Sequence, residues 1–430
     1  MLRLAAPLAL AELGWIAMGF VDMVMVGRLG AVPLGAGSLG NMVMYPLAIC
    51  ATGLLLGMDT LVAQAHGAEE HLESRRALVN GVWLGLALSP LVALAVLATI
   101  PLLRIAGANP LVLEQLGPYL IALLWGLPGL MLYSAFRRYL QAVNVVHPVM
   151  FALVSANLVN LGGNWLLIYG HWGLPALGLR GSGLATSISR VYMAAVLLAA
   201  IVWHERRTGQ LLRRISRLPE IERVMRLVKL GLPAAGQILF EGAVFGIVTA
   251  LAARLDAVSL AAHSIAVQVI ATTYMVPLGI SSAAAVRVGQ AVGRRDRGGA
   301  SVSGWTALLL STGFMSLAGV TLWTVPRWIA GIFIGDAAVV TLAAVLLRIA
   351  AFMELFDGLQ TVATGALRGL GDTRSPMLAH FAGYWMIGLP VVYVLGFARG
   401  WGVTGIWVGL TAAIVMIGMV LIIVWWRRAR

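Results

Sequence analysis

The sequence contains little cysteine and little charge. Cys50 is the single cysteine in 430 residues, which excludes an internal disulfide and argues against thiolate metal sites. Charged residues make up only 11% of the chain. The 7 histidines are scattered, and there is no glycine-rich loop ending in Lys-Ser or Lys-Thr to bind ATP phosphates. We therefore expect neither a disulfide-stabilised protein nor one driven directly by ATP.

Apolar residues are abundant. They form 60% of the chain, and the mean hydropathy is +0.92, far outside the range of soluble domains. They fall into about twelve segments, each long enough to cross a bilayer as a helix, and none has the alternating period of a membrane barrel strand. The sequence predicts an all-α integral membrane protein with helices near 4–27, 34–62, 77–101, 116–136, 148–169, 179–203, 227–253, 260–287, 302–325, 338–366, 377–398 and 402–426.

The basic residues predict the orientation of these helices. The formal net charge is +13, but the basic residues alternate between connections instead of forming one face, so we expect no nucleic-acid partner. Both chain ends and the even-numbered connections carry Arg3, Arg75-Arg76, Arg137-Arg138, the stretch 206–229, Arg294-Arg295 with Arg297, Arg374, and Arg427-Arg428 with Arg430. The odd-numbered connections carry little more than Arg28, Arg104, Arg180, Arg254, Arg327 and Arg399. By the positive-inside rule, both termini are expected in the cytoplasm.

The two halves of the chain resemble each other without gaps. Pro7 matches Pro233, an offset of 233 − 7 = 226, and "RLGAVPLGAGS" from Arg28 matches "RLDAVSLAAHS" from Arg254 at the same offset. This repeat predicts a duplication. We expect an amino-terminal lobe at 1–203, a cytoplasmic linker at 204–226 and a carboxy-terminal lobe at 227–430.

Each half holds six segments, an even number, so both halves enter the membrane from the same side. This arrangement predicts two six-helix lobes related by a pseudo-two-fold axis along the membrane normal. Such parallel repeats are typical of transporters that move two bundles around a central site. The architecture therefore favours a transporter.

Several acids lie within or near the predicted spans, where charge is costly and usually functional. An alternative is that each acid is a packing residue, paired with a neighbour or protonated. The repeat offset aligns Asp22 with Val248 and Glu241 with Trp15, so the shared scaffold requires neither carboxylate. The acids within predicted spans are Glu12, Asp22, Glu241, Glu354 and Asp357, and Asp59 lies near a cytoplasmic end.

Two groups of polar residues are candidate cation sites. Asn160 and Asn164 are four apart on one helical face, and with Thr186 they offer neutral oxygens. A carboxylate with such oxygens suits Na+, and a carboxylate alone takes a proton. The alternative is that the amides only bond across a helix interface.

The second group is in the other half. Glu354, Asp357 and Thr361 share one side of a helix, and Gln237 precedes Glu241 by one turn. Nearby carboxylates repel each other, which suits proton exchange.

The chain resembles the multidrug and toxic compound extrusion (MATE) family, in particular its bacterial NorM-like branch. The resemblance covers nearly the whole chain, through "MGFVDMVMVGRLGA", "VAQAHGA", "VNLGGNWLLIYG", "GLRGSGLATS", "ILFEGAVFG", "AAHSIA", "VRVGQAVG" and "FDGLQTVATGALRGLGDTRSPM". It implies a multi-pass protein of the bacterial inner membrane that acts as a monomer and takes organic cations as substrates.

The resemblance also implies roles for individual residues. Asp22, Asn160, Asn164 and Thr186 match the amino-lobe cation site, and Glu241 with Asp357 matches the carboxy-lobe acids. Na+ is expected at either set, or H+ in its place, with no other cofactor. Pro7 is the expected helix kink, and Gln237, Glu354 and Thr361 are auxiliary candidates. The roles of Glu12 and Asp59 stay open, although we favour an interfacial charge near Arg75 or Arg76 for Asp59.

These features predict a cation-driven antiporter for cationic, aromatic drugs. Its cavity is expected to use aromatic and Met side chains, with Met18, Phe240, Phe245, Tyr274 and Met353 as candidates that packing or lipid contact would explain equally well. One alternative is a flippase of the same superfamily, which would need a cationic cavity. A membrane enzyme would need an Asp-rich or His-centred site. His263 and His380 are the histidines near span interiors, and we expect packing to satisfy both.

Overall fold

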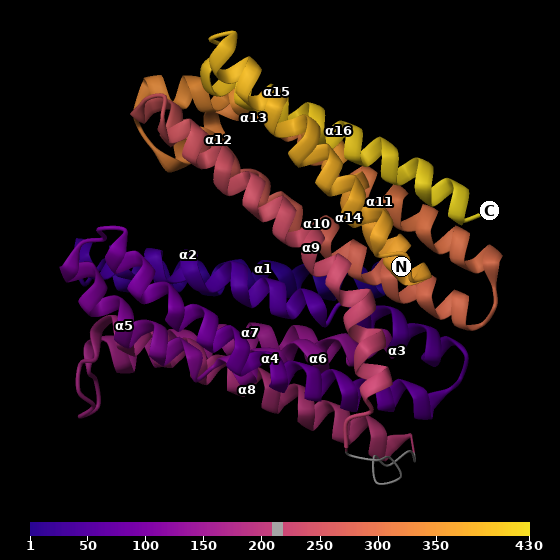
Figure 1. Cartoon of the computed structure of the whole chain (residues 1–430). Helices are drawn as coiled ribbons and strands as arrows, with labels where there is room; N and C mark the ends of the chain where they lie inside the picture. The colour runs from indigo at the N-terminus through magenta and orange to yellow at the C-terminus, as the bar shows by residue number, and fades with distance from the viewer. Residues whose placement is uncertain (209–217) are drawn as a thin grey trace. The chain divides into compact units, whose positions relative to one another are not determined.

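The computed structural model describes residues 1–208 and 218–430, which form helices and loops without a strand (Figure 1). Within these residues, 11 helices are long and apolar enough to cross a membrane. A further pair, Pro110–Leu124 and Leu127–Ala142, passes the same test together and is bent by 42°. The prediction of an all-helical membrane protein with about twelve spans is confirmed, and every predicted segment coincides with one of these helices or with the bent pair.

The chain forms two compact units. Residues Leu10–Ala235 form the amino-terminal unit, and Gly236–Arg430 with Met1–Ala9 form the carboxy-terminal unit. The first helices are α1 (Leu2–Gly27), α2 (Ala31–Leu54), α3 (Gly57–Gly67), α4 (His71–Ile105), α5 (Pro110–Leu124), α6 (Leu127–Ala142), α7 (His147–Tyr169) and α8 (Gly178–Arg207). The remaining helices are α9 (Ile221–Ala253), α10 (Ala257–Gly293), α11 (Arg297–Thr324), α12 (Pro326–Phe333), α13 (Ala337–Leu370), α14 (Arg374–His380), η2 (Phe381–Gly388), α15 (Leu389–Tyr393), η3 (Val394–Ala398) and α16 (Gly402–Arg428).

The helix boundaries repeat at the offset found in the sequence. Helix α1 ends at Gly27 and α9 ends at Ala253, an offset of 253 − 27 = 226. Helices α2 and α10 begin at Ala31 and Ala257, which differ by the same offset. The division into units also follows this offset, because α1 changes unit after Ala9 and α9 changes unit after Ala235. The two repeats therefore share one local design, although the compact units do not divide the chain at the predicted linker.

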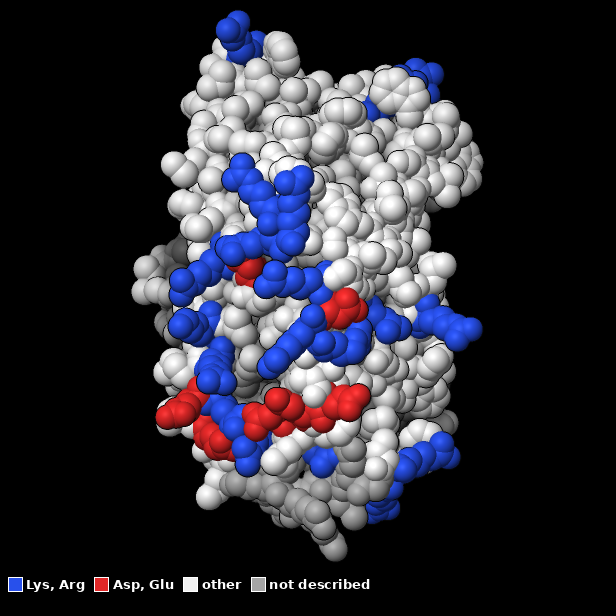
Figure 2. All heavy atoms as spheres, turned by 90° about the vertical axis from the view of Figure 1, so that its right-hand side faces the viewer, with Lys and Arg blue, Asp and Glu red and all other residues white. Residues whose placement is uncertain are grey.

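Several helices extend beyond the apolar segments. We expected the Arg75-Arg76 and Arg137-Arg138 pairs in connections, but they lie inside α4 and α6. The apolar pattern marks only the part of a helix that meets hydrocarbon, so it underestimates the full length. The predicted linker 204–226 overlaps α8 and α9 at its ends, and its residues 209–217 lie outside the described part of the chain. Figure 2 shows a surface on which Lys and Arg side chains outnumber those of Asp and Glu.

Proline explains two local irregularities. Gly126 lies in the bend between α5 and α6, and Pro128 follows at the start of α6, where its missing N–H is tolerated. Pro390 near the start of α15 has no N–H for a bond one turn back, and the π-helical stretch η2 lies directly before it. Neither the π-helices η2 and η3 nor the short helix α12 was predicted from the sequence.

Candidate functional site

The predicted amino-lobe residues meet around Asp22. Asn164 of α7 donates from Nδ2 to Asp22 Oδ1 at 2.5 Å, and Thr186 of α8 donates from Oγ1 to Asp22 Oδ2 at 3.0 Å. Asn164 also donates to Asn160 Oδ1 at 3.1 Å. Asn160 and Asn164 are fully buried and Thr186 is nearly so. The structure thus brings together all four residues that the sequence proposed for this site.

Close packing of α7 and α8 positions these side chains. Asn160 and Asn164 lie one turn apart on α7, and Gly163 between them faces Ala185, the residue before Thr186. Near the start of α8, Gly181 approaches the α7 backbone so closely that a Cβ would overlap the carbonyl of Leu167. Such proximity of backbones is typical of small residues at membrane helix interfaces.

One buried acceptor at this site, Asn164 Oδ1, has no hydrogen-bond partner among the described residues. The Asn160 side chain is hydrogen-bonded to Asp22 as well. A buried acceptor without a partner beside a carboxylate is suited to a cation. The oxygens of Asp22, Asn164, Asn160 and Thr186 therefore form a donor set that fits Na+, and the carboxylate alone fits a proton.

Three further polar residues near Asp22 were missed by the sequence analysis. Tyr119 of α5 donates from its hydroxyl to Asn41 Oδ1 of α2 at 3.3 Å. Arg190 of α8 lies one turn after Thr186 and interacts electrostatically with both Asp22 and Tyr119. An arginine inside an apolar helix is itself a sign of a functional site, because charge in a membrane span is costly. Arg190 supplies a fixed positive charge close to the carboxylate.

The carboxy-terminal unit contains a second acidic cluster. Glu354 of α13 is fully buried and accepts from Thr273 Oγ1 at 2.7 Å, while Asp357 accepts from Gln360 Nε2 at 2.8 Å. Asp357 interacts electrostatically with Glu241 of α9 and with Glu354. The structure therefore gathers the three predicted carboxylates of this half.

The auxiliary candidates lie at the same cluster. Gln237 is hydrogen-bonded to Glu241 one turn away, and Thr361 is hydrogen-bonded to Tyr274. Gln360 also donates from Nε2 to the hydroxyl of Tyr384 at 3.3 Å. Tyr274 and Tyr384 both interact electrostatically with Glu241, so hydroxyl groups surround the acids.

His380 is also part of this cluster. Its Nδ1 lies 2.8 Å from the carbonyl oxygen of Pro376, so Nδ1 carries a hydrogen and donates it. Its Nε2 lies 3.4 Å from Gln237 Nε2, which makes Nε2 the acceptor, and 3.9 Å from Glu241 Oε2. We expected packing to satisfy this histidine. The structure places it beside Glu241, a candidate ion-binding acid.

His263 has the opposite arrangement. Trp407 Nε1 donates to His263 Nδ1 at 3.2 Å, so Nε2 carries the hydrogen and donates it to Thr249 Oγ1 at 3.0 Å. Both nitrogens therefore have neutral partners, as the packing interpretation expected. The two histidines are equally buried, with 1% exposure each, and differ in their surroundings.

Two consecutive arginines of α6 bind the acids whose roles the sequence left open. Arg137 donates to Glu12 of α1, and Arg138 donates to both oxygens of Asp59 in α3 at 2.9 and 3.0 Å. Asp59 is 3% exposed, and Arg138 was not among the arginines that we expected near it. The helix extends past the apolar segment and carries both guanidinium groups inward.

The candidate cavity residues fall into two groups. Met18 and Met353 are buried in the core, at 6% and 1% exposure, which favours a packing role. Phe240 lies 5.1 Å from Phe381 and 6.2 Å from Trp385 between ring centroids, and it directly precedes Glu241. Phe245 lies 6.5 Å from Tyr384 between ring centroids. Pro7 lies inside α1, and its role as a kink stays a prediction.

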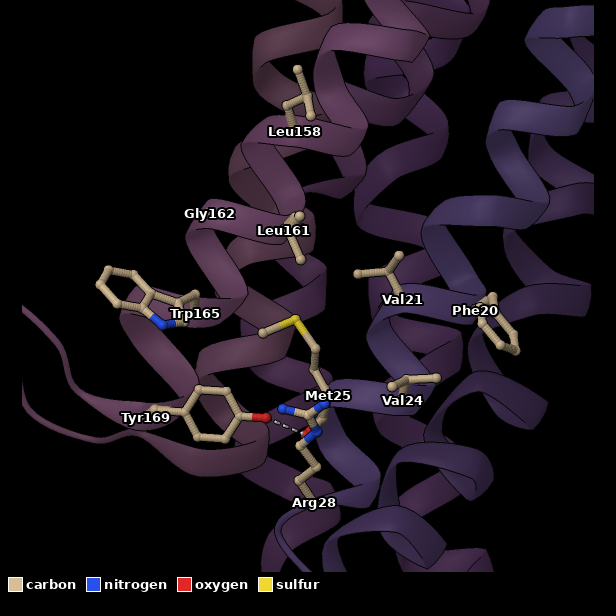
Figure 3. Close-up of a pocket in the computed structure, with 10 residues that line it drawn as sticks. All are labelled: Phe20, Val21, Val24, Met25, Arg28, Leu158, Leu161, Gly162, Trp165 and Tyr169. Carbon is tan, nitrogen blue, oxygen red and sulfur yellow. Dashed lines mark hydrogen bonds between the residues drawn. The ribbon is translucent and has the colours of Figure 1, made fainter.

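A groove of about 640 Å³ runs between α1 and α7 (Figure 3). Its lining includes one charged side chain, Arg28, and no acid. Tyr169 donates from its hydroxyl to the carbonyl of Met25 at 2.9 Å at the same end of the groove.

The structure contains no group of three or more His, Cys, Asp or Glu side chains placed for a metal ion within the described residues.

A family model described as MatE matches the chain twice, at residues 7–166 and 233–394. The chain belongs to the MatE family, and the resemblance seen in its motifs is confirmed. The starts of the two matches differ by 233 − 7 = 226, which is the offset of the duplicated motifs.

Curated relatives match along almost the whole chain. The chain is 38% identical over 431 residues to the "Probable multidrug resistance protein NorM" of Rhodopseudomonas palustris, covering 99% of this chain and 90% of that protein. It is 36% identical over 438 residues to the protein of the same name from Mesorhizobium japonicum, covering 100% and 93%.

Solved structures share the fold. An outward-facing multidrug resistance MATE family transporter superposes with a TM-score of 0.91 at 19% identity, over 100% of this chain and 95% of that one. The eukaryotic MATE transporter AtDTX14 superposes with a TM-score of 0.89 at 20% identity, over 100% and 96%. At these identities the likeness concerns the fold.

Proposed function

We propose that this protein is a secondary active multidrug efflux transporter, not an enzyme, which exchanges inward Na+ or H+ for outward organic cations. The observation that carries the proposal is Asp22, half-buried inside an apolar helix, with neutral oxygens from α7 and α8 around it. A carboxylate in an apolar helix is costly unless a cation or proton uses it. The relatives named as multidrug resistance proteins support the nature of the cargo.

The cycle follows from charge compensation. Binding of Na+ or H+ neutralises the carboxylates and weakens their attraction for an organic cation, which then leaves. The neutralised protein changes conformation at lower cost because fewer charges meet a low dielectric. Release of the coupling ion restores the charge, and the next organic cation binds. Arg190 contributes a positive charge near Asp22.

An aromatic group beside Glu241 suits the cargo. The ring of Phe240 contacts the rings of Phe381 and Trp385, and Trp385 Nε1 donates to the carbonyl of Phe240 at 3.2 Å. An aromatic face attracts an organic cation without requiring one shape, and a nearby carboxylate adds charge attraction. We assign the binding of cationic, aromatic compounds to this group together with Glu241 and Asp357.

The location follows from topology. The distribution of basic residues supports cytoplasmic termini, and the relatives are bacterial proteins, which supports the inner membrane. We propose a monomer in the lipid bilayer, with the lobes at 1–203 and 227–430 joined by the linker at 204–226. The flippase alternative is not favoured, because the polar clusters of both units are built around carboxylates.

The test uses purified protein in liposomes loaded with a fluorescent cationic dye, with Na+ and pH gradients imposed separately. Wild type is compared with Asp22→Asn, Glu241→Gln and Asp357→Asn. We expect one gradient to drive dye movement, and at least one variant to lose it. Absence of gradient-driven movement for a broad dye panel, with the variants indistinguishable from wild type, would refute the proposal.

A further inference from the structure

The groove between α1 and α7 has the length of one membrane leaflet. Its α7 lining extends from Leu158 to Tyr169. At a helical rise of about 1.5 Å for each step along the chain, this interval spans about 16 Å. Half of a hydrocarbon core of about 30 Å is about 15 Å. The groove therefore spans the depth that one acyl chain occupies.

Its lining is chemically graded along this length. The deep part is formed by exposed aliphatic and aromatic side chains, among them Leu158 and Phe20 at 70% and 66% exposure. Arg28 follows directly after the end of α1, and Figure 3 shows it at the end of the groove where Tyr169 and Met25 lie. The charged end is thus at the end of a membrane helix, where headgroups begin.

Aromatic residues mark this end as the membrane surface. Trp165 stacks on His171 with ring centroids 3.9 Å apart and meets Trp172 edge-on at 5.9 Å. Trp172 is 85% exposed, and Tyr169 contacts His171. Clusters of Trp and Tyr sit at the headgroup level of bilayers. Arg28 therefore lies at the level of lipid phosphates.

The charge of the lining selects the occupant. Arg28 is the only charged residue in it, and no carboxylate faces the groove. An organic cation would meet one positive charge and no negative one. An anionic amphiphile would place its acidic group on a guanidinium, which binds phosphate with two parallel hydrogen bonds. The groove is thus complementary to a lipid and not to the cationic cargo.

We propose that the α1–α7 groove binds an anionic phospholipid, with the phosphate on Arg28 and one acyl chain along the groove. The site is independent of the transport cycle proposed above. It adjoins the ion site, because Val21 and Leu161 of its lining are sequence neighbours of Asp22 and Asn160. A bound lipid therefore bridges α1 and α7, two of the three helices that carry the Asp22 cluster.

Two variants separate the headgroup contact from the chain contact. Arg28→Gln removes the charge. Gly162→Leu fills the groove from within its lining, and the helix tolerates the change because a Cβ there meets nothing within 4 Å. The matched controls are Arg104→Gln, another exposed arginine at the end of a membrane helix, and Gly117→Leu, which also has open space at its Cβ.

The experiment measures lipid retention by native mass spectrometry of the full chain, after exposure to phosphatidylglycerol or phosphatidylcholine in detergent micelles. For wild type we expect one tightly retained phosphatidylglycerol and weaker retention of phosphatidylcholine. Arg28→Gln should lower phosphatidylglycerol retention at least about tenfold, the size expected for loss of a hydrogen bond to a charged group. Gly162→Leu should also lower it, because the new side chain occupies the space of the acyl chain. The two controls should retain it as wild type does.

Three results would overturn the proposal. Equal retention by all five proteins would place the lipid elsewhere. Equal retention of the two lipids by wild type would remove the role of Arg28. Displacement of the lipid by a cationic dye that binds in the groove would assign this surface to the cargo.

Thermal unfolding of each variant identifies a misfolded protein. If Arg28→Gln is misfolded, Arg28→Lys replaces it as a test of two-point phosphate binding.

Discussion

Asp22 of α1 accepts a 2.5 Å hydrogen bond from Asn164 of α7, 142 positions later in the chain. The same amide group donates to Asn160, so one side chain links the carboxylate to the second amide of the site. Because both amides are fully buried, water does not compensate for any loss of these bonds. The arrangement of α1 against α7 is thereby sensitive to whether Asp22 carries a charge.

Asp22→Asn is expected to abolish coupling while preserving the fold. Asparagine has the shape of aspartate and still accepts from Asn164, but it has no charge to attract Na+ or H+. A neutral amide also avoids the cost of burying a charge, so the fold is retained. Gradient-driven dye efflux from liposomes should fall at least about tenfold, in the range of coupling between two sites. Unchanged efflux together with an unchanged melting temperature would show that Asp22 has no part in coupling.

Phe240→Ala is expected to weaken binding of aromatic cations. The ring of Phe240 contacts those of Phe381 and Trp385 beside Glu241. Loss of one cation–π partner should lower dye affinity about three- to tenfold, measured by fluorescence polarisation. Phe352→Ala is the control, because Phe352 is a 59% exposed aromatic in the same unit. An equal loss of affinity in both variants would argue against the assigned binding group.

His380→Asn should impair transport more than stability. An asparagine amide takes the place of Nδ1 and keeps a donor near the Pro376 carbonyl, but nothing replaces Nε2 beside Gln237 and Glu241. We expect slower gradient-driven efflux and a changed dependence on external pH or Na+. The matched control is His263→Asn, in which the amide oxygen takes the place of Nδ1 and still accepts from Trp407 Nε1, while nothing replaces Nε2 beside Thr249. That variant should lose thermal stability and keep the ion dependence of wild type, and the reverse pattern would contradict the assignment.

Gly181→Ala should destabilise the amino-terminal unit. A Cβ at this position would lie 2.5 Å from the carbonyl carbon of Leu167 and 2.9 Å from the backbone nitrogen of Ile168. Overpacking of this kind costs about 1–3 kcal/mol and separates α7 from α8. Gly19→Ala, with nothing within 4 Å of the new Cβ, should instead stabilise the helix by about 0.5–1 kcal/mol. The melting temperatures of the two variants, measured in the same detergent, should move in opposite directions.

Glu205→Gln should be among the most damaging changes outside the ion sites. Arg75 Nε lies 2.7 Å from Glu205 Oε2, and Tyr139 donates to Glu205 Oε1 at 2.5 Å. The side chains of Arg75 and Glu205 are 8% and 4% exposed. Removal of one partner from a buried pair costs about 3 kcal/mol, because the other charge remains uncompensated. The melting temperature of Glu205→Gln tests this. Replacing all three polar groups, as Arg75→Met and Glu205→Leu with Tyr139→Phe, should recover much of the loss, and no difference between the single and triple variants would contradict it.

The fold was predictable because the bilayer imposes a simple rule. Every backbone polar group in hydrocarbon must be bonded within its own segment, so each long apolar run becomes a helix. The duplication was also visible in the sequence. Pro7 and Pro233 lie at equivalent positions of α1 and α9, and the ends of these two helices differ by the same offset as the two prolines. This rule applies only to the part of a helix inside the hydrocarbon. It therefore did not predict that α6 continues through Arg137 and Arg138 or that both side chains point inward.

The sequence by itself determined the membrane-spanning helices, the repeat and the residue types of the ion sites, because hydrophobicity and helical spacing are local properties of the chain. Only the tertiary structure decided which groups meet. Neither the proximity of Arg190 to Asp22 nor the different surroundings of His263 and His380 follows from local pattern. Partners across helices depend on rotation and crossing of whole helices, which are set by the close approach of two backbones at positions such as Gly181.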